Sequence, residues 1–142
     1  MVSGIGIDMV RNSRIEELIE KWGEKFLRKI FTDDELAQNS NGKNRNISYA
    51  ANYAVKEAFV KALGTGFRRG IKFHNIAVKR NELGKPFIDL RGSTKEIAEQ
   101  KGLSRIHTTI SHDGEYSVAV VLSLIHISEP RDRTRSRMPS SA

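Results

Sequence analysis

Apolar and polar positions change their period several times along the 142-residue chain, and each change predicts a new element. Val2 to Val10 is largely apolar around two glycines and predicts a buried strand that ends at Asp8. Ser13 and Glu16 then have the spacing of a capping box, which predicts the start of a helix. The apolar residues that follow recur on one helical face: Ile15, Leu18, Ile19 and Trp22.

The middle of the chain predicts a short helix, a loop and one long helix. Thr32 and Glu35 form a second capping-box pattern, which opens the short helix. The polar run from Asn39 to Asn46 predicts a loop. The long helix should begin near Ser48 and end at Gly64, because glycine readily adopts the positive φ that terminates a helix.

The remaining sequence predicts strands in antiparallel pairs with one more helix between them. Helical and extended segments are thus intermixed, without repeats or a linker. The pattern favours the α+β class: a single compact domain with an antiparallel sheet packed against a long helix. The expected elements are strands Ile71 to Arg80 and Pro86 to Leu90, a helix opened by a Ser93-to-Glu96 capping box and ended at Gly102, and a hairpin of Arg105 to His112 and Glu115 to Val121 turned by Asp113-Gly114.

Composition narrows the choice of compartment and partner. The chain contains no cysteine, which excludes disulfides and thiolate metal sites. No apolar run approaches the roughly 20 residues needed to cross a bilayer, so we expect no membrane partner. The first residues lack the features of an export signal, and we expect a cytoplasmic protein. A net charge of +7 is compatible with nucleic acid, acidic proteins or polyphosphate ligands, and does not choose among them.

The C-terminal stretch differs in character from the rest. Residues 122 to 142 resemble a translated sequencing-library adapter, most clearly in LSLIHISEP and SRMPSSA. We therefore predict a domain over residues 1–121 and a non-native, disordered tail over residues 122–142. The alternative is a native basic arm that contacts nucleic acid.

Two acids stand out as candidate metal ligands. Asp8 closes an apolar strand, and Glu57 lies among alanines of the long helix. Each has an ordinary structural alternative: Asp8 could cap the following helix, and Glu57 could pair with Lys61 four residues later. If the two converge, they suit Mg²⁺, which binds few protein carboxylates and completes its shell with water and phosphate oxygens. Lys56 and Lys61 flank Glu57 and suit the phosphates, so the pattern predicts a phosphate-transfer site.

The chain also offers a candidate base near its C-terminal hairpin. Ser111 and His112 precede the expected turn, and His112 could take a proton from an attacking alcohol. Its structural alternative is a histidine that caps the turn. Neighbouring strand residues point to opposite faces, so Ser111 and His112 are poorly arranged as a nucleophile and its base. The Gly64-Thr65-Gly66 turn follows a helix and lacks a Gly-Lys-Ser/Thr ending, which disfavours a nucleoside-triphosphate hydrolase.

Four segments in this order resemble the holo-acyl-carrier-protein synthase family of phosphopantetheinyl transferases, over essentially Val2 to Val121. They are GIGID, VKEAFVKALGTG, GKP and ISHD. The resemblance implies an α+β fold, coenzyme A as donor, Mg²⁺, an acyl carrier protein as acceptor, and a homotrimer with sites between subunits. The implied reaction moves phosphopantetheine from coenzyme A to a carrier serine and releases adenosine 3',5'-bisphosphate.

The resemblance also assigns roles to individual residues. Asp8 and Glu57 match the metal ligands, and Arg14 matches a basic position that meets the carrier protein. His112 matches a proposed catalytic base, with a metal-bound water or Glu57 as the alternatives. The positions that match the coenzyme A site are Lys56, Lys61, Pro86 and Ser111. One departure is Asn52, where family members often have an arginine that contacts the nucleotide's additional phosphate.

Two other classes of function explain part of the pattern. A small basic nucleic-acid-binding domain would account for the charge, but it leaves the two acids unexplained and lacks a known binding motif. Nucleic acid is therefore not an expected partner. A catalytically inactive carrier-binding module would keep the role of Arg14 and lose metal dependence.

Overall fold

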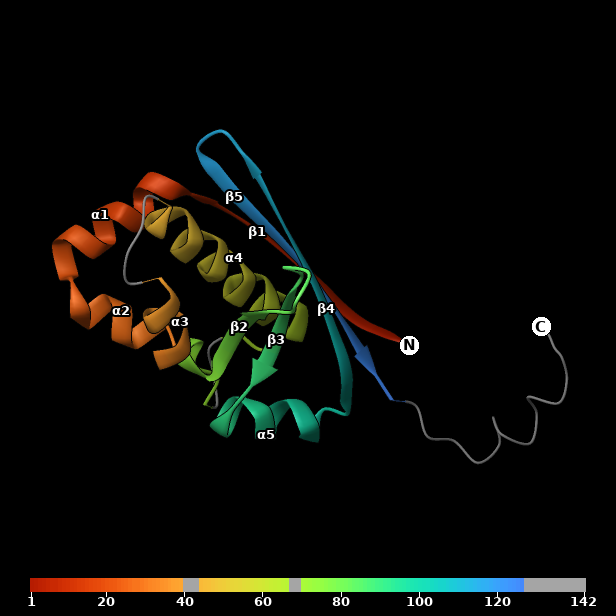
Figure 1. The fold of residues 1–142 in the computed structure, drawn as a ribbon. Coiled ribbons are helices and arrows are strands. Elements are labelled where there is room, and N and C mark those ends of the chain that lie inside the picture. Colours follow the sequence, from red (N-terminus) through yellow and green to blue (C-terminus); the bar gives the residue numbers. More distant parts are fainter. Residues whose placement is uncertain (40–43, 67–69, 127–142) are drawn as a thin grey trace, which may run out of the picture.

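The computed structural model describes residues 1–39, 44–66 and 70–126. Figure 1 shows a long antiparallel sheet with a helix lying along it, and smaller elements grouped beside that helix. The elements in chain order are β1 (Val2–Arg11), α1 (Asn12–Trp22), α2 (Glu24–Ile30), α3 (Asp33–Gln38), α4 (Arg45–Leu63), the 3₁₀ helix η1 (Phe73–Asn75), β2 (Ile76–Arg80), β3 (Pro86–Leu90), α5 (Gly92–Gln100), β4 (Leu103–Asp113) and β5 (Tyr116–Ile125). The α+β class is confirmed, and so is the packing of antiparallel strands against a long helix.

The main sheet has the order β1-β5-β4, with both neighbouring pairs antiparallel. Every second residue of β5 is buried, from Ser117 to Ser123, because that face of the sheet packs on α4. The opposite face of β1 exposes Ile5, Ile7 and Met9. The sheet therefore has one face in the core of the subunit and one apolar face that the subunit leaves uncovered.

The helix α4 lies unusually close to β1 because two glycines of the strand face it. A Cβ on Gly6 would overlap the carbonyl oxygen of Ala58, and a Cβ on Gly4 would overlap that of Ala62. The alanines of α4 complete this close contact, since they are almost fully buried. The GIGID strand and the alanine-rich helix thus fit each other backbone against backbone, which fixes the position of the residues just beyond them.

The predicted long helix is confirmed, including its end, where Gly64 has a φ of 79° and its N–H bonds Val60 O at 3.1 Å. Its start at Arg45 is three residues earlier than predicted. Residues 40–43 of the predicted loop lie outside the described residues. The Thr32 and Glu35 capping box is present in full, with both reciprocal hydrogen bonds.

The other two capping boxes are wrong. The helix α1 begins at Asn12, so Ser13 lies inside it, and neither α1 nor α5 has a side-chain cap. Ser93 uses its hydroxyl for a tertiary contact instead, donating to Gly70 O at 2.6 Å. Trp22 was predicted on the buried face, but it is 50% exposed at the end of α1.

Several strand boundaries also differ from prediction. The strand β1 continues past Asp8 to Arg11, and β4 begins at Leu103 instead of Arg105. The strand predicted over Ile71 to Arg80 begins only at Ile76, because η1 precedes it. The strand β5 continues to Ile125, where the N–H of Ile125 bonds Met1 O at 2.9 Å. Residues 122–125, assigned above to the tail, therefore pair in the sheet, and residues 127–142 lie outside the described part of the chain. None of the described helices is both long and apolar enough to span a membrane.

Candidate active site

Asp8 lies on the face of β1 that points toward α4. Side chains alternate along a strand, so Asp8 shares this face with Gly4, Gly6 and the buried Val10. Its side chain is only 15% exposed, and its Oδ1 accepts a hydrogen bond of 3.1 Å from the ammonium of Lys61 on α4. The same ammonium donates to Ile7 O at 3.0 Å. β1 and α4 are therefore joined by a charged contact in addition to the close glycine contacts.

Tyr53 brings the second acid into the same place. Burial, followed by the charge of Glu57 and a hydrogen bond to it, raises the pKa of Tyr53 to about 12. The charge of Asp8 raises this pKa further and that of Arg14 lowers it. The pKa of Tyr53 thus depends on both candidate metal ligands and on Arg14 of α1. Its ring is fixed by stacking on Phe73, with 5.5 Å between the ring centroids.

The donor set fits Mg²⁺ better than a cation that requires a complete protein cage. No group of three or more histidine, cysteine, aspartate or glutamate side chains occurs among the described residues. Asp8 and Glu57 instead offer two carboxylates, with the partly exposed ammonium group of Lys61 paired to Asp8. Two carboxylates suit Mg²⁺, which retains waters and accepts phosphate oxygens from a substrate.

Lys56 does not have the predicted role of a phosphate ligand. It is fully buried on the core side of α4, and its ammonium forms an ion pair of 2.9 Å with Glu35. The same ammonium donates to the carbonyl oxygens of Phe73, at 3.0 Å, and Ile76. All three donors of the lysine are therefore used within the fold. Consecutive helical residues point about 100° apart, so Glu57 can face Asp8 while Lys56 faces the core.

The remaining predicted site residues, His112, Ser111 and Pro86, lie on β3 and β4. His112 pairs with Ser117 and Val10 lies opposite Ser117, so His112 shares the α4-facing side of the sheet with Asp8. Two strand spacings separate β4 from β1, or about 10 Å. Ser111 pairs with Val118 and lies on the opposite, outer face. Pro86 begins β3 in the separate two-stranded sheet. One subunit therefore joins Asp8, Glu57, Lys61 and Arg14, but not Ser111 or Pro86.

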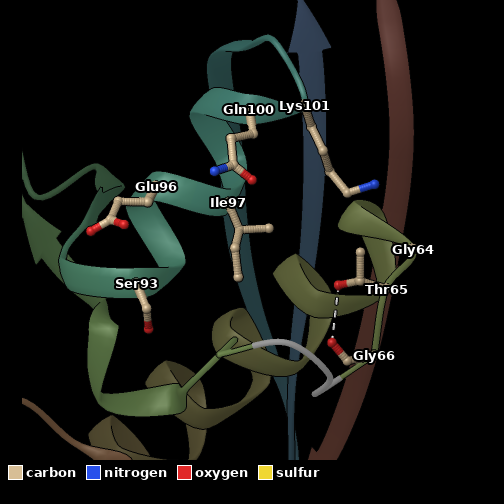
Figure 2. Close-up of a pocket in the computed structure, with 8 residues that line it drawn as sticks. All are labelled: Gly64, Thr65, Gly66, Ser93, Glu96, Ile97, Gln100 and Lys101. Atoms are coloured by element: carbon tan, nitrogen blue, oxygen red, sulfur yellow. Dashed lines mark hydrogen bonds between the residues drawn. The ribbon is translucent and has the colours of Figure 1, made fainter.

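A cavity of about 680 Å³ opens beyond the C-terminal end of α4. Figure 2 shows side chains of α5 on one side of it and the turn of Gly64 to Gly66 on the other, where the hydroxyl of Thr65 bonds Gly66 O at 3.0 Å. None of its lining residues was predicted as a site residue. They are Gly64, Thr65, Gly66, Ser93, Glu96, Ile97, Gln100 and Lys101.

Sequence reasoning missed three residues that support the site. Tyr53 contacts Glu57, and Glu35 holds Lys56 in the core. Ser117 lies within 3.0 Å of the His112 ring. Glu35 was predicted as part of a capping box, but a cap residue gives no signal that its carboxylate is also buried against a lysine. Tyr53 has such a signal, because it lies four residues before Glu57 on the same helical face.

The chain matches proteins of known activity over most of its length. The sequence profile of the 4'-phosphopantetheinyl transferase superfamily matches residues 4–121. The holo-(acyl-carrier-protein) synthase of Halothermothrix orenii is 41% identical over 122 residues, which are 86% of this chain and 97% of that protein. That of Neisseria meningitidis superposes with a TM-score of 0.82 at 34% identity, covering 87% of this chain and 99% of that one.

A third relative has been solved with a ligand. The holo-(acyl-carrier-protein) synthase of Helicobacter pylori, in complex with coenzyme A, superposes with a TM-score of 0.75 at 30% identity, over 84% of this chain and 99% of that one. The fold is that of a phosphopantetheinyl transferase. The chain belongs to the 4'-phosphopantetheinyl transferase superfamily, and its relatives place it in the holo-acyl-carrier-protein synthase family. The predicted resemblance is thereby confirmed.

Proposed function

We propose that the protein transfers phosphopantetheine from coenzyme A to a serine of an apo acyl carrier protein. The observation that carries this proposal is the convergence of Asp8 and Glu57 on Tyr53, with Lys61 beside Asp8. Two carboxylates and an exposed ammonium match the needs of a pyrophosphate donor. A nucleic-acid-binding domain would account for the positively charged Lys61, but it would not account for the two carboxylates.

In the reaction, the oxygen of the carrier serine forms a bond to the phosphorus that carries pantetheine. The bond from that phosphorus to the bridging oxygen breaks, and adenosine 3',5'-bisphosphate leaves. Asp8 and Glu57 would hold Mg²⁺, which supplies charge neutralisation for the pyrophosphate when bound. Lys61 stabilises the negative charge that develops on the same oxygens. His112 accepts the serine proton through its ring.

The carrier protein docks on α1 through Arg14. Arg14 is exposed, and it lies near the acid pair because its charge acts on Tyr53. A shallow apolar groove continues along α1 and α2 on this side, and lysines border it: its residues are Leu18, Trp22, Lys25, Phe26 and Lys29. Basic groups around an apolar groove suit an acidic partner that carries apolar side chains, and the excess positive charge accelerates the encounter.

The active form is a homotrimer with sites between subunits. Ile5, Ile7 and Met9 form an apolar stripe on the outer face of β1, and they are 65%, 58% and 62% exposed in the single subunit. Large exposed apolar groups in one row favour contact with another protein surface. Ser111 lies on this outer face too. A neighbouring copy that packs there would therefore bring Ser111 of one subunit toward the acids of the next.

The deciding experiment mixes the protein with an apo acyl carrier protein, coenzyme A and Mg²⁺, and weighs the carrier by mass spectrometry. We expect the mass of one phosphopantetheine to be added, and none when Mg²⁺ is removed with a chelator. Glu57→Ala should abolish the addition, because one of two metal-binding carboxylates is lost. Glu99→Ala, which removes an exposed helical carboxylate on α5, is the matched control and should leave the rate unchanged.

Two outcomes would contradict the proposal. An unmodified carrier from a correctly folded, trimeric protein would favour the carrier-binding module without activity. Normal Mg²⁺-dependent turnover in folded Glu57→Ala would remove this residue from the metal site. The assembly is tested separately by light scattering after size exclusion, where Ile7→Glu should convert the trimer to monomers.

A further inference from the structure

Three side chains from three elements form a hydrogen-bonded chain that ends at the His112 ring. Ser117 of β5 donates its hydroxyl hydrogen to Asn12 Oδ1 at 2.7 Å. The oxygen of the same hydroxyl lies 3.0 Å from His112 Nδ1 on β4. Ser117 is fully buried, and Asn12 is the first residue of α1, with its own N–H bonded to Glu115 O at 2.7 Å. The chain is thus anchored at both its middle and its far end.

The hydrogen bonds of Ser117 determine the tautomer of the neutral His112 ring. A serine hydroxyl carries one hydrogen, and a carboxamide oxygen only accepts. Since Ser117 gives its hydrogen to Asn12, its oxygen can meet His112 only as an acceptor. Nδ1 must then be the donor, and the neutral imidazole carries its hydrogen on Nδ1. Nε2 is left with the lone pair, because a neutral ring has one donor and one acceptor nitrogen.

We infer that Asn12 and Ser117 are positioning residues that hold neutral His112 in its Nδ1–H form, with Nε2 as the nitrogen available to take the serine proton. The inference rests on the proposed function, in which His112 is the base. It goes further by assigning the reacting nitrogen and the two residues that select it. A base whose ring and tautomer are fixed beforehand needs no reorganisation when the substrate arrives.

The buried serines of β5 show that this arrangement is specific to one end of the strand. Ser123 lies on the same face as Ser117 and is equally buried, but its hydroxyl donates only to the backbone oxygen of Gly4, at 3.3 Å. Ser123 therefore satisfies the backbone, whereas Ser117 connects two side chains. Ser123→Ala serves as the comparison variant, because it also removes a buried hydroxyl from this face of β5. It costs one hydrogen bond to the backbone, whereas Ser117→Ala costs two, and only Ser117 contacts a histidine ring.

The test is nitrogen NMR of the protein with ¹⁵N-labelled histidine, at a pH where His112 is neutral. His112→Asn identifies the signals of His112 among the four histidines. We expect hydrogen on Nδ1 in the wild type and in Ser123→Ala, and loss of this preference in Ser117→Ala. Asn12→Asp keeps an acceptor for Ser117 and should keep the Nδ1–H form, whereas Asn12→Ala should lose it. Hydrogen on Nε2 in the wild type would overturn the inference.

Kinetics separate this inference from the proposed function. Ser117→Ala should lower kcat by roughly tenfold, because a poorly positioned base loses part of its contribution to the rate. KM for coenzyme A should not change. Ser123→Ala should stay within about twofold. If His112→Asn retains full turnover while the wild type has Nδ1–H, the base assignment fails and the tautomer assignment stands. If Ser117→Ala loses the tautomer but keeps the wild-type kcat, the positioning role is refuted.

Discussion

Lys61 Nζ of α4 lies 3.1 Å from Asp8 Oδ1 of β1, and this contact joins the two halves of the site. The sequence left open whether Lys61 would pair with Glu57 along the helix. The structure gives Asp8 as its partner, and the phenol of Tyr53 contacts Glu57 instead. The two candidate metal ligands therefore have different neighbours: Asp8 pairs with an ammonium group and Glu57 with a phenol.

Lys61→Ala should affect catalysis far more than stability. The lysine side chain is 54% exposed, and an exposed ion pair contributes about 0–1 kcal/mol to folding. Loss of its charge from the developing phosphate oxygens should lower kcat/KM for coenzyme A by about 100-fold. Steady-state kinetics and urea denaturation measure the two effects. Lys79→Ala is the control, because Lys79 also forms partly exposed ion pairs but lies on β2.

Gly6→Ala should destabilise the fold by about 3 kcal/mol or more, since an added Cβ overlaps the Ala58 carbonyl and forces α4 away from β1. Gly102→Ala separates this clash from backbone strain. Gly102 has a φ of 79° but open space around its Cβ position, and should cost only about 1 kcal/mol. Chemical denaturation gives both values. Equal losses in the two variants would show that the close approach is unimportant.

Patterns that depend on nearby residues were predictable from the sequence, and those that depend on distant partners were not. The long helix and its end at Gly64 follow from local periodicity and glycine conformation, and both were confirmed. The capping boxes at Ser13 and Ser93 failed because α1 begins at Asn12 and α5 at Gly92, so both serines lie inside their helices. Asp8 and Glu57 could be proposed as a pair, but only the glycine-mediated packing explains why their elements meet.

The environment of Lys56 shows most clearly what the sequence could not predict. A lysine beside a candidate metal ligand on a helix is indistinguishable in sequence from a phosphate ligand. Its actual environment is supplied by Glu35, Phe73 and Ile76, each at least 17 residues away. None of these contacts has a local signal, because they arise only when α3 and η1 pack against α4.

Lys56→Met should therefore unfold the protein readily instead of weakening coenzyme A binding alone. Removing one partner of a buried ion pair leaves the Glu35 carboxylate without its cation and costs about 3–5 kcal/mol. The exposed pair of Arg28 and Glu24 provides the control: Arg28→Ala should cost less than about 1 kcal/mol. Thermal and urea denaturation compare the two. A loss below about 1 kcal/mol for Lys56→Met would contradict the structural role.

Arg14→Glu should weaken the carrier and leave the donor unaffected. Charge reversal on α1 repels an acidic partner, so KM for the carrier should rise about tenfold or more at low salt, and the difference should shrink at high salt. KM for coenzyme A should not change. Lys95→Glu on α5 makes the same change in net charge away from α1 and is the control. Similar effects of the two reversals would mean that total charge, and not Arg14, governs docking.

Tyr53 makes stability depend on pH at the alkaline end. Its pKa is raised from 10.0 to about 12, first by burial and then by the Glu57 carboxylate. The folded protein keeps the phenol proton to higher pH than the unfolded chain does. The resulting stabilisation is complete below pH 10 and is lost as the pH rises through about 12. Denaturation between pH 9 and 12 should therefore show a steeper loss of stability in the wild type than in Tyr53→Phe.

Glu57→Gln, which removes the neighbouring charge but keeps the burial, should move the phenolate titration of Tyr53 to lower pH. An unchanged titration in that variant would mean that the phenol and Glu57 are not in contact, and the inferred proximity of Glu57 to Asp8 would lose its support.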